Sequence, residues 1–411
     1  MQRQWKTTGI ITGALALLLV LAPAGRAQEQ AEDEGEAVNP GAGLFVSREL
    51  KREKRREARA GEWAFTLQGS ADVGYDSNIY RSSKPDTFDG NIKDSAFSGF
   101  AARAEALRYF TRDDHFEVGV EGGYVSYFEN HEADPISGEL ELQYEHTFSK
   151  AFRMSLMSGV QMDNDHATNI NGAGFSRNFR NTVYKSELGG VYTLAKVHDV
   201  SLSYFIKRKD YVATANLNDL DWLEQGPEFR YKWEIAKPVD LRLWYDFSIQ
   251  QYDTEPANDL NGAELGTPEE EHFFHKALAW LSIAPTDDVK LNFKYTFEVK
   301  DDRFVGYESY KNHGIEGGFN WGVTKAFSWE TTAYLDLRQY KHRENTAPTD
   351  PSLEYDKLGI DTTGRYELNK YVSLYALYSF ARRDTNRPLD SGTSYRDYTV
   401  HMAGAGVSVA M

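Results

Sequence analysis

Charged side chains occupy every second position in several apolar segments of this 411-residue chain. In GELELQYEHTF (138–148), every second residue from Glu139 is acidic or polar; in VKLNFKYTFEVK (289–300), every second residue from Lys290 is polar or charged. Rows of carboxylates and ammonium groups do not break bonds by themselves, but they attract, repel and orient ions and polar solutes. The chemistry predicted from these residues is therefore electrostatic selection.

Two groups of charged residues are predicted to share the polar face of these segments. The acidic group comprises Asp72, Asp76, Glu105, Glu117, Glu121, Glu139, Glu141 and Glu145. The basic group comprises Lys207, Arg230, Lys232, Arg242, Lys276, Lys290 and Lys294. If both groups line one lumen, an acidic wall faces a basic arc, an arrangement that favours hydrophilic cargo. The alternative is that these groups form ion pairs along the wall and simply keep the interior solvated.

A long polar connection at 163–180 contains charges that could narrow such a lumen. Asp163, Asp165, Arg177 and Arg180 would form the constriction if the loop folds inward. The alternative is a loop exposed at the cell surface. Asp163 and Asp165 also offer oxygen ligands, but the glycine and distal glutamate of a calcium loop are missing, so no metal is predicted there.

The sequence contains little that indicates catalysis. Neither a G-x-S-x-G elbow nor an H-E-x-x-H helix occurs. His272 and His275 lie three residues apart on an expected strand, so they should point to opposite faces and not share a metal. Cysteine is absent, which excludes disulfides and thiolate sites. We expect no catalytic residue, cofactor or metal site, and hence no enzyme.

The elements that would position these charges are β-strands, because a period of two is the strand period. From residue 62 onward, seven very short connections alternate with eight long polar ones, which predicts sixteen strands. One of the longest expected loops is 252–271. An apolar face and a charged face sustained over residues 62–411 are typical of a transmembrane β-barrel. The predicted fold is all-β, a single antiparallel barrel of about sixteen strands.

The segments before the barrel are predicted to be a signal peptide and a leader. Residues 1–27 combine basic residues, an apolar stretch and a small-residue cleavage site. Residues 28–61 are charged, and a short helix is expected at 47–59. This leader is interpreted as a solvated periplasmic segment; the alternative is a basic plug or partner-docking helix.

An even strand number places both termini on one side of the membrane, and short turns face the periplasm in barrels of this class. The predicted location is therefore the outer membrane of a Gram-negative cell, with both termini periplasmic. The expected partners are outer-membrane lipid, lipopolysaccharide and the barrel-insertion machinery. A net charge of −16 argues against nucleic acid, and a mean hydropathy of −0.59 is compatible with a barrel because apolar residues alternate with polar ones.

The start of the barrel, GSADVGYDSNIYR at 69–81, carries Gly-Tyr-Asp-Ser-Asn at 74–78. This motif resembles the opening strand of the type-two outer-membrane β-barrel porin family. The resemblance implies a porin that accompanies exopolysaccharide synthesis and export, with polysaccharide-export components as further candidate partners. It implies no catalytic residues.

The leading functional hypothesis is a passive channel for hydrophilic solutes or an exported polysaccharide. The alternative is a non-conducting surface or assembly barrel that binds a partner through its loops or its basic leader.

Overall fold

The computed structural model describes residues 63–79, 94–111, 113–129, 134–165, 179–211, 221–259, 263–342, 352–386 and 397–411. These ranges contain sixteen β-strands, and the expected number is confirmed. The strands are β1 (Trp63–Asp76), β2 (Ser95–Tyr109), β3 (Asp114–Tyr127), β4 (Ile136–Ser149), β5 (Phe152–Asp165), β6 (Phe179–Leu194), β7 (His198–Tyr211), β8 (Trp222–Ala236), β9 (Val239–Asn258), β10 (Glu264–Ile283), β11 (Val289–Asp302), β12 (Tyr310–Gly322), β13 (Phe327–Tyr340), β14 (Glu354–Glu367), β15 (Val372–Thr385) and β16 (Tyr398–Ala410).

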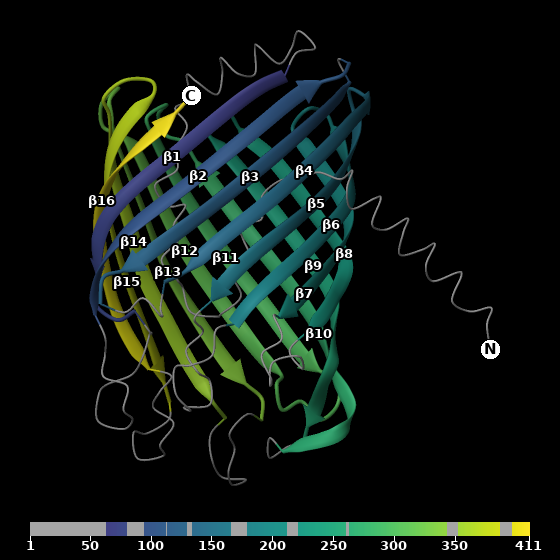
Figure 1. Ribbon diagram of the computed structural model, residues 1–411. Helices are drawn as coiled ribbons and strands as arrows, with labels where there is room; N and C mark the ends of the chain where they lie inside the picture. The colour runs from purple at the N-terminus through teal and green to yellow at the C-terminus, as the bar shows by residue number, and fades with distance from the viewer. Residues whose placement is uncertain are drawn as a thin grey trace, which may run out of the picture.

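Each strand pairs antiparallel with its neighbours in the chain, and β1 pairs with β16, so the sheet closes into a barrel. The strands tilt strongly against the barrel axis (Figure 1), as closure of a twisted sheet requires. Closure leaves every strand with two neighbours over the length of the barrel wall, which satisfies the backbone N–H and C=O groups of both edges.

The two faces of the wall differ in polarity. On β1, the outward side chains Phe65, Leu67 and Val73 are 60%, 48% and 61% exposed, whereas Gln68 and Ser70 on the other face are 7% and 4% exposed. The large apolar residues that remain exposed elsewhere, such as those on β7 and β11, follow the same alternation. An apolar exterior around a polar interior is the arrangement of a membrane-spanning barrel.

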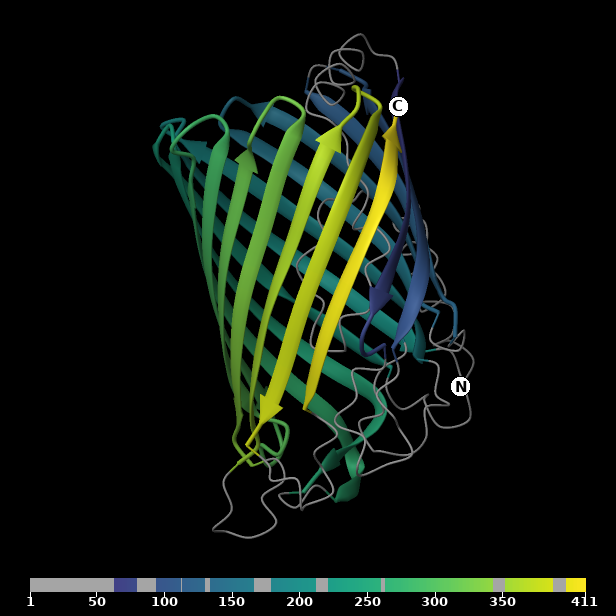
Figure 2. The same cartoon turned by 90° about the vertical axis from the view of Figure 1, so that its left-hand side faces the viewer.

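The short connections gather at the end of the barrel where the C-terminus lies (Figure 2). Several are closed by a side-chain hydroxyl or amide that accepts hydrogen bonds from the following backbone. Thr324 accepts from the N–H groups of Ala326 and Phe327 at 3.2 and 2.9 Å, and Ser149 accepts from those of Ala151 and Phe152 at 3.2 and 3.1 Å. Such turns need few residues because the side chain substitutes for a missing backbone partner.

The Gly-Tyr-Asp-Ser-Asn segment at 74–78 ends β1 at the opposite, long-loop end of the barrel. Asp76 and Asn78 are fully buried. The Asn78 N–H donates to Asp76 Oδ1 at 2.9 Å, and Asn78 Nδ2 donates to the carbonyl of Thr399 at 3.2 Å. The Tyr127 hydroxyl donates to Asp76 Oδ2 at 3.4 Å. The motif therefore ties β1 to β16 and β3, a structural role.

The prediction of a long loop at 252–271 is wrong. β9 continues to Asn258 and β10 begins at Glu264, so these two strands form a hairpin that projects beyond its neighbours (Figures 1 and 2). The projecting part contains Pro256 and Pro268 and many acidic residues, which read as loop in the sequence. It nevertheless pairs with itself, with register shifts near Glu269, because backbone pairing within a hairpin does not depend on alternating side chains.

The expected signal peptide (1–27), leader (28–61) and helix (47–59) lie outside the described residues. Among the residues that are described, none forms a helix long and apolar enough to cross a membrane.

Candidate functional site in the barrel interior

Pairing register identifies the side chains that face the interior. Residues directly opposite each other on antiparallel strands lie on the same face, so the face can be followed from Gln68 on β1 to Arg103 on β2 and Glu121 on β3. All fifteen charged residues predicted to share one face lie on it by this register, namely Asp72, Asp76, Glu105, Glu117, Glu121, Glu139, Glu141, Glu145, Lys207, Arg230, Lys232, Arg242, Lys276, Lys290 and Lys294. That they select a solute stays a prediction.

The acidic wall, defined as the inward carboxylates of β2–β4, surrounds one arginine. Arg103 Nε lies 2.7 Å from Glu105 Oε1, Nη1 lies 2.8 Å from Glu121 Oε2, and Nη2 lies 3.4 Å from Glu141 Oε2. One guanidinium has five donors and can satisfy several acceptors. Its single positive charge, however, leaves an excess of negative charge on three glutamates that lie within one small area.

The same wall continues toward the short turns. Glu145 lies 4.0 Å from His115 Nδ1 and 3.8 Å from Arg153 Nε, measured from its two carboxylate oxygens. Glu139 stands directly opposite Glu121 in the register. Over β2–β4 the inward carboxylates thus outnumber the inward arginines that contact them.

The basic arc, defined as the inward lysines and arginines of β7–β11, carries carboxylate partners. Three of the six pairs given below join neighbouring strands, as expected for cross-strand pairs, two lie within one strand, and Arg230–Glu187 spans the intervening strand β7. The nitrogen–oxygen distances are 3.8 Å for Lys207–Glu224, 3.8 Å for Arg230–Glu187, 2.6 Å for Lys232–Glu234, 3.1 Å for Arg242–Asp240, 3.9 Å for Lys276–Glu298 and 3.5 Å for Lys294–Glu316.

The two arcs therefore differ in their net electrostatics. In a closed barrel of sixteen strands, β2–β4 lie across the interior from β10–β12. The expectation of opposed acidic and basic walls is modified by the ion pairs: the acidic wall keeps an excess of carboxylates over cations, whereas most cations of the basic arc are paired with carboxylates along the wall. For the basic arc, the contacts fit the alternative interpretation.

A set of inward aromatic residues at the long-loop end was not predicted. These side chains are less than a tenth exposed and comprise Phe97, Tyr127, Tyr211, Trp222, Tyr310, Tyr340, Tyr355 and Tyr398. Cations lie over several of the rings: Lys207 Nζ is 4.9 Å from the Trp222 centroid, and Arg338 Cζ is 4.2 Å from that of Tyr310. The signal available in the sequence was an aromatic residue near each long connection, at a position where the alternation calls for an inward-facing polar residue.

The predicted constriction is described only in part. Asp163 lies on the inner face of β5, where it accepts a 2.7 Å hydrogen bond from Gln161 Nε2. Asp165 and Arg180 belong to the paired ends of β5 and β6. Arg177 and the rest of the connection at 166–178 lie outside the described residues, so an inward loop stays a prediction.

The described ranges contain no group of three or more His, Cys, Asp or Glu side chains arranged to hold a metal ion. His272 is buried, with Nε2 2.8 Å from Glu270 Oε1, while His275 lies on the outer face with Nδ1 2.8 Å from the Tyr245 hydroxyl. The two histidines point to opposite faces, as the strand period predicts.

No family model matches the sequence, and no curated protein matches it. The fold is similar to solved outer-membrane proteins. The high-pH structure of Pseudomonas putida OprB shares 9% identity at a TM-score of 0.50, over 87% of this chain and 96% of that one. Acinetobacter baumannii OccAB1 shares 12% identity at a TM-score of 0.47, over 84% and 97%. A structure described as a bacterial polysaccharide outer membrane secretin shares 10% identity at a TM-score of 0.43, over 84% and 97%. At these identities the likeness concerns the fold alone.

Proposed function

We propose that this protein is a passive outer-membrane channel for hydrophilic solutes that prefers cations to anions. The observation that carries the proposal is the acidic wall around Arg103, which is set against a basic arc whose charges are mostly paired. An excess of carboxylates over cationic groups in a confined aqueous path raises the local concentration of cations and lowers that of anions.

The membrane setting is part of the same proposal. The apolar exterior supports insertion among lipids, with lipopolysaccharide and the insertion machinery as partners, and the short turns and both termini in the periplasm. The cargo class follows from charge: neutral or cationic solutes would pass more easily than polyanions. An exported polysaccharide, which the family resemblance implies together with export components, would therefore be neutral or cationic.

The test is ion selectivity in planar bilayers. Under a potassium chloride gradient, the reversal potential should show preference for potassium, and the Glu139→Gln/Glu141→Gln double variant should reduce that preference by about two-fold or more, because two inward carboxylates are lost. Glu354→Gln is the matched control, since Glu354 lies on the outer face of β14. Preference for chloride, or an unchanged reversal potential in the double variant, would contradict the selectivity.

A second candidate function is a non-conducting surface or assembly barrel. The buried inward aromatics at the long-loop end favour it, because side chains that cover one another, such as Tyr310 and Tyr340 with ring centroids 5.4 Å apart, leave less open cross-section. The same measurement decides between the two: a folded barrel that carries no current at any voltage would support this second function.

A further inference from the structure

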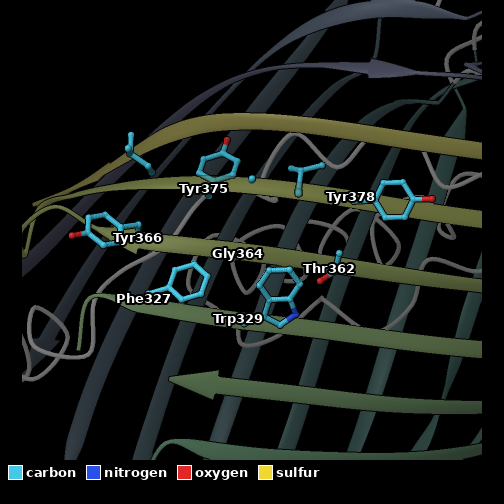
Figure 3. Close-up of a pocket in the computed structure, with 10 residues that line it drawn as sticks. Phe327, Trp329, Thr362, Gly364, Tyr366, Tyr375 and Tyr378 are labelled. Carbon is cyan, nitrogen blue, oxygen red and sulfur yellow. The ribbon is translucent and has the colours of Figure 1, made fainter. Parts of the chain in front are cut away.

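The outer face of β13–β15 contains a groove that plays no part in the proposed channel function. Its volume is about 430 Å³, within the range of about 300–1,000 Å³ of small-molecule sites. Phe327 and Trp329 form one wall and Tyr378 the other, with Gly364 between them (Figure 3). Leu374 of β15 also lines the groove.

The groove exists because β14 carries a small residue between large ones. A Cβ on Gly364 would lie 3.5 Å from the ring of Trp329 and 3.6 Å from that of Phe327. Ala376, beside Gly364 in the register, is also small. Gly364 and Ala376 therefore form the bottom of the groove, and the larger side chains beside them rise above it. The groove follows the direction of β14.

The groove presents apolar surface and few available polar atoms. Trp329 Nε1 already donates to Thr331 Oγ1 at 2.8 Å, and Thr331 Oγ1 lies 2.8 Å from Thr362 Oγ1. The Tyr378 hydroxyl lies 2.9 Å from His401 Nδ1. Since these groups satisfy one another, the groove suits a hydrocarbon chain better than a sugar or a peptide.

The length and position of the groove match one membrane leaflet. It extends over five residues of β14, from Thr362 to Tyr366, with Phe327 and Tyr366 at the end near the short turns (Figure 3). The four steps between five strand residues span about 13 Å, which is close to half of a hydrocarbon core of about 30 Å. A single acyl chain of the leaflet next to the short turns would lie along it.

Two lysines mark the end of the groove where a headgroup would sit. Lys325 is exposed in the turn that precedes Phe327. Lys370 lies in the turn that follows Tyr366, with Nζ 4.8 Å from the centroid of Tyr371. Ammonium groups at the polar boundary attract the phosphate of an anionic lipid.

We propose that this groove binds one anionic glycerophospholipid of the leaflet next to the short turns, with an acyl chain over Gly364 and the phosphate near Lys325 and Lys370. Binding requires the barrel to sit in a membrane but does not require it to conduct. The two proposals can therefore fail independently of each other.

The test is native mass spectrometry of the folded, full-length mature barrel released from detergent micelles that contain phosphatidylglycerol and phosphatidylcholine with identical acyl chains. The wild type should retain one phosphatidylglycerol in preference to phosphatidylcholine. Lys325→Gln and Lys370→Gln should each reduce that preference about five-fold. Gly364→Phe should abolish retention of both lipids, because a ring fills the groove.

Matched controls are available in the same chain. Lys150→Gln alters a lysine in the turn between β4 and β5. In that turn a side-chain hydroxyl accepts two backbone hydrogen bonds, as in the turn of Lys325. Ala104→Phe adds a ring to the outer face of β2. Both should retain lipid as the wild type does. Should Gly364→Phe fail to fold, the two lysine variants, which leave the groove intact, still decide the question.

Three outcomes would overturn the proposal. The first is that Gly364→Phe retains as much lipid as the wild type. The second is that the wild type retains lipopolysaccharide but not phosphatidylglycerol when both are offered. The third is that Gly364→Phe loses a dimer or trimer while its lipid retention is unchanged. The last result would assign the groove to a second copy of the chain.

Discussion

The Tyr375 hydroxyl donates a 2.8 Å hydrogen bond to Asp72 Oδ2, which joins β15 to β1 across the inner face of β16. The contact spans a strand because Gly406, which pairs with both residues, has no side chain between them. The bond thus closes the barrel a second time, inside the backbone ladder of β1 and β16.

Replacement of Tyr375 by Phe should weaken this closure. The carboxylate of Asp72 would lose a donor, and hydrogen bonds to charged groups contribute about 1.5–3 kcal/mol. We expect a lower urea midpoint of unfolding with an unchanged slope. Tyr371→Phe is the control, because Tyr371 lies in the turn before β15 and is 44% exposed. Equal midpoints for Tyr375→Phe and wild type would show that the bond contributes nothing.

Gly406→Leu should be more disruptive than removal of the hydroxyl. A Cβ at this position would lie 2.6 Å from the Tyr375 hydroxyl and would also meet the carbonyl of Ala71. Both the ring and the backbone would have to move, a kind of overpacking that costs about 1–3 kcal/mol. At Gly317 an added Cβ meets nothing within 4 Å, so Gly317→Ala should leave heat-modifiable gel mobility and the urea midpoint unchanged. Similar effects at both glycines would contradict this account.

Local patterning accounts for what could be predicted of the fold. Alternation of side chains is a property of each strand alone, so the strand number, the two faces and the parity of Glu139 and Lys294 could be derived without knowing any partner. The same rule misread the tips of β9 and β10, because these segments form strands although their sequences lack apolar–polar alternation.

Non-local pairing accounts for what could not be predicted of the site. Whether Lys276 acts as a free charge depends on Glu298 standing opposite it, and that depends on the register between two strands. Likewise, the meeting of Tyr375 and Asp72 requires closure of the whole barrel. Charge alternation identified the inner residues, but only the register distinguished the unbalanced acidic wall from the paired basic arc.

The projecting part of the β9–β10 hairpin should be dispensable for folding. Beyond the pairs Trp222–Tyr252 and His272–Asp302, β8 and β11 provide no further partners in the register. Replacement of residues 255–268 by a short Asn-Gly turn should change the free energy of unfolding by less than about 1 kcal/mol. Heat-modifiable gel mobility and circular dichroism check this. An unfolded product would show that the arm helps to assemble the barrel.

Arg103→Gln should increase cation selectivity, because it removes the positive charge that lies among Glu105, Glu121 and Glu141. The affected carboxylates would then repel one another at short range, so some loss of stability is also expected, limited by their partial exposure to water.

The decisive readout is the reversal potential under a potassium chloride gradient, which should shift further toward the potassium equilibrium value. Adding Glu121→Gln should bring it back, because one negative charge is removed with the positive one. Arg382→Gln, which alters an exposed pair with Asp384 on the outer face, should leave the potential unchanged. A shift toward chloride in Arg103→Gln would mean that the permeating ions do not pass the acidic wall.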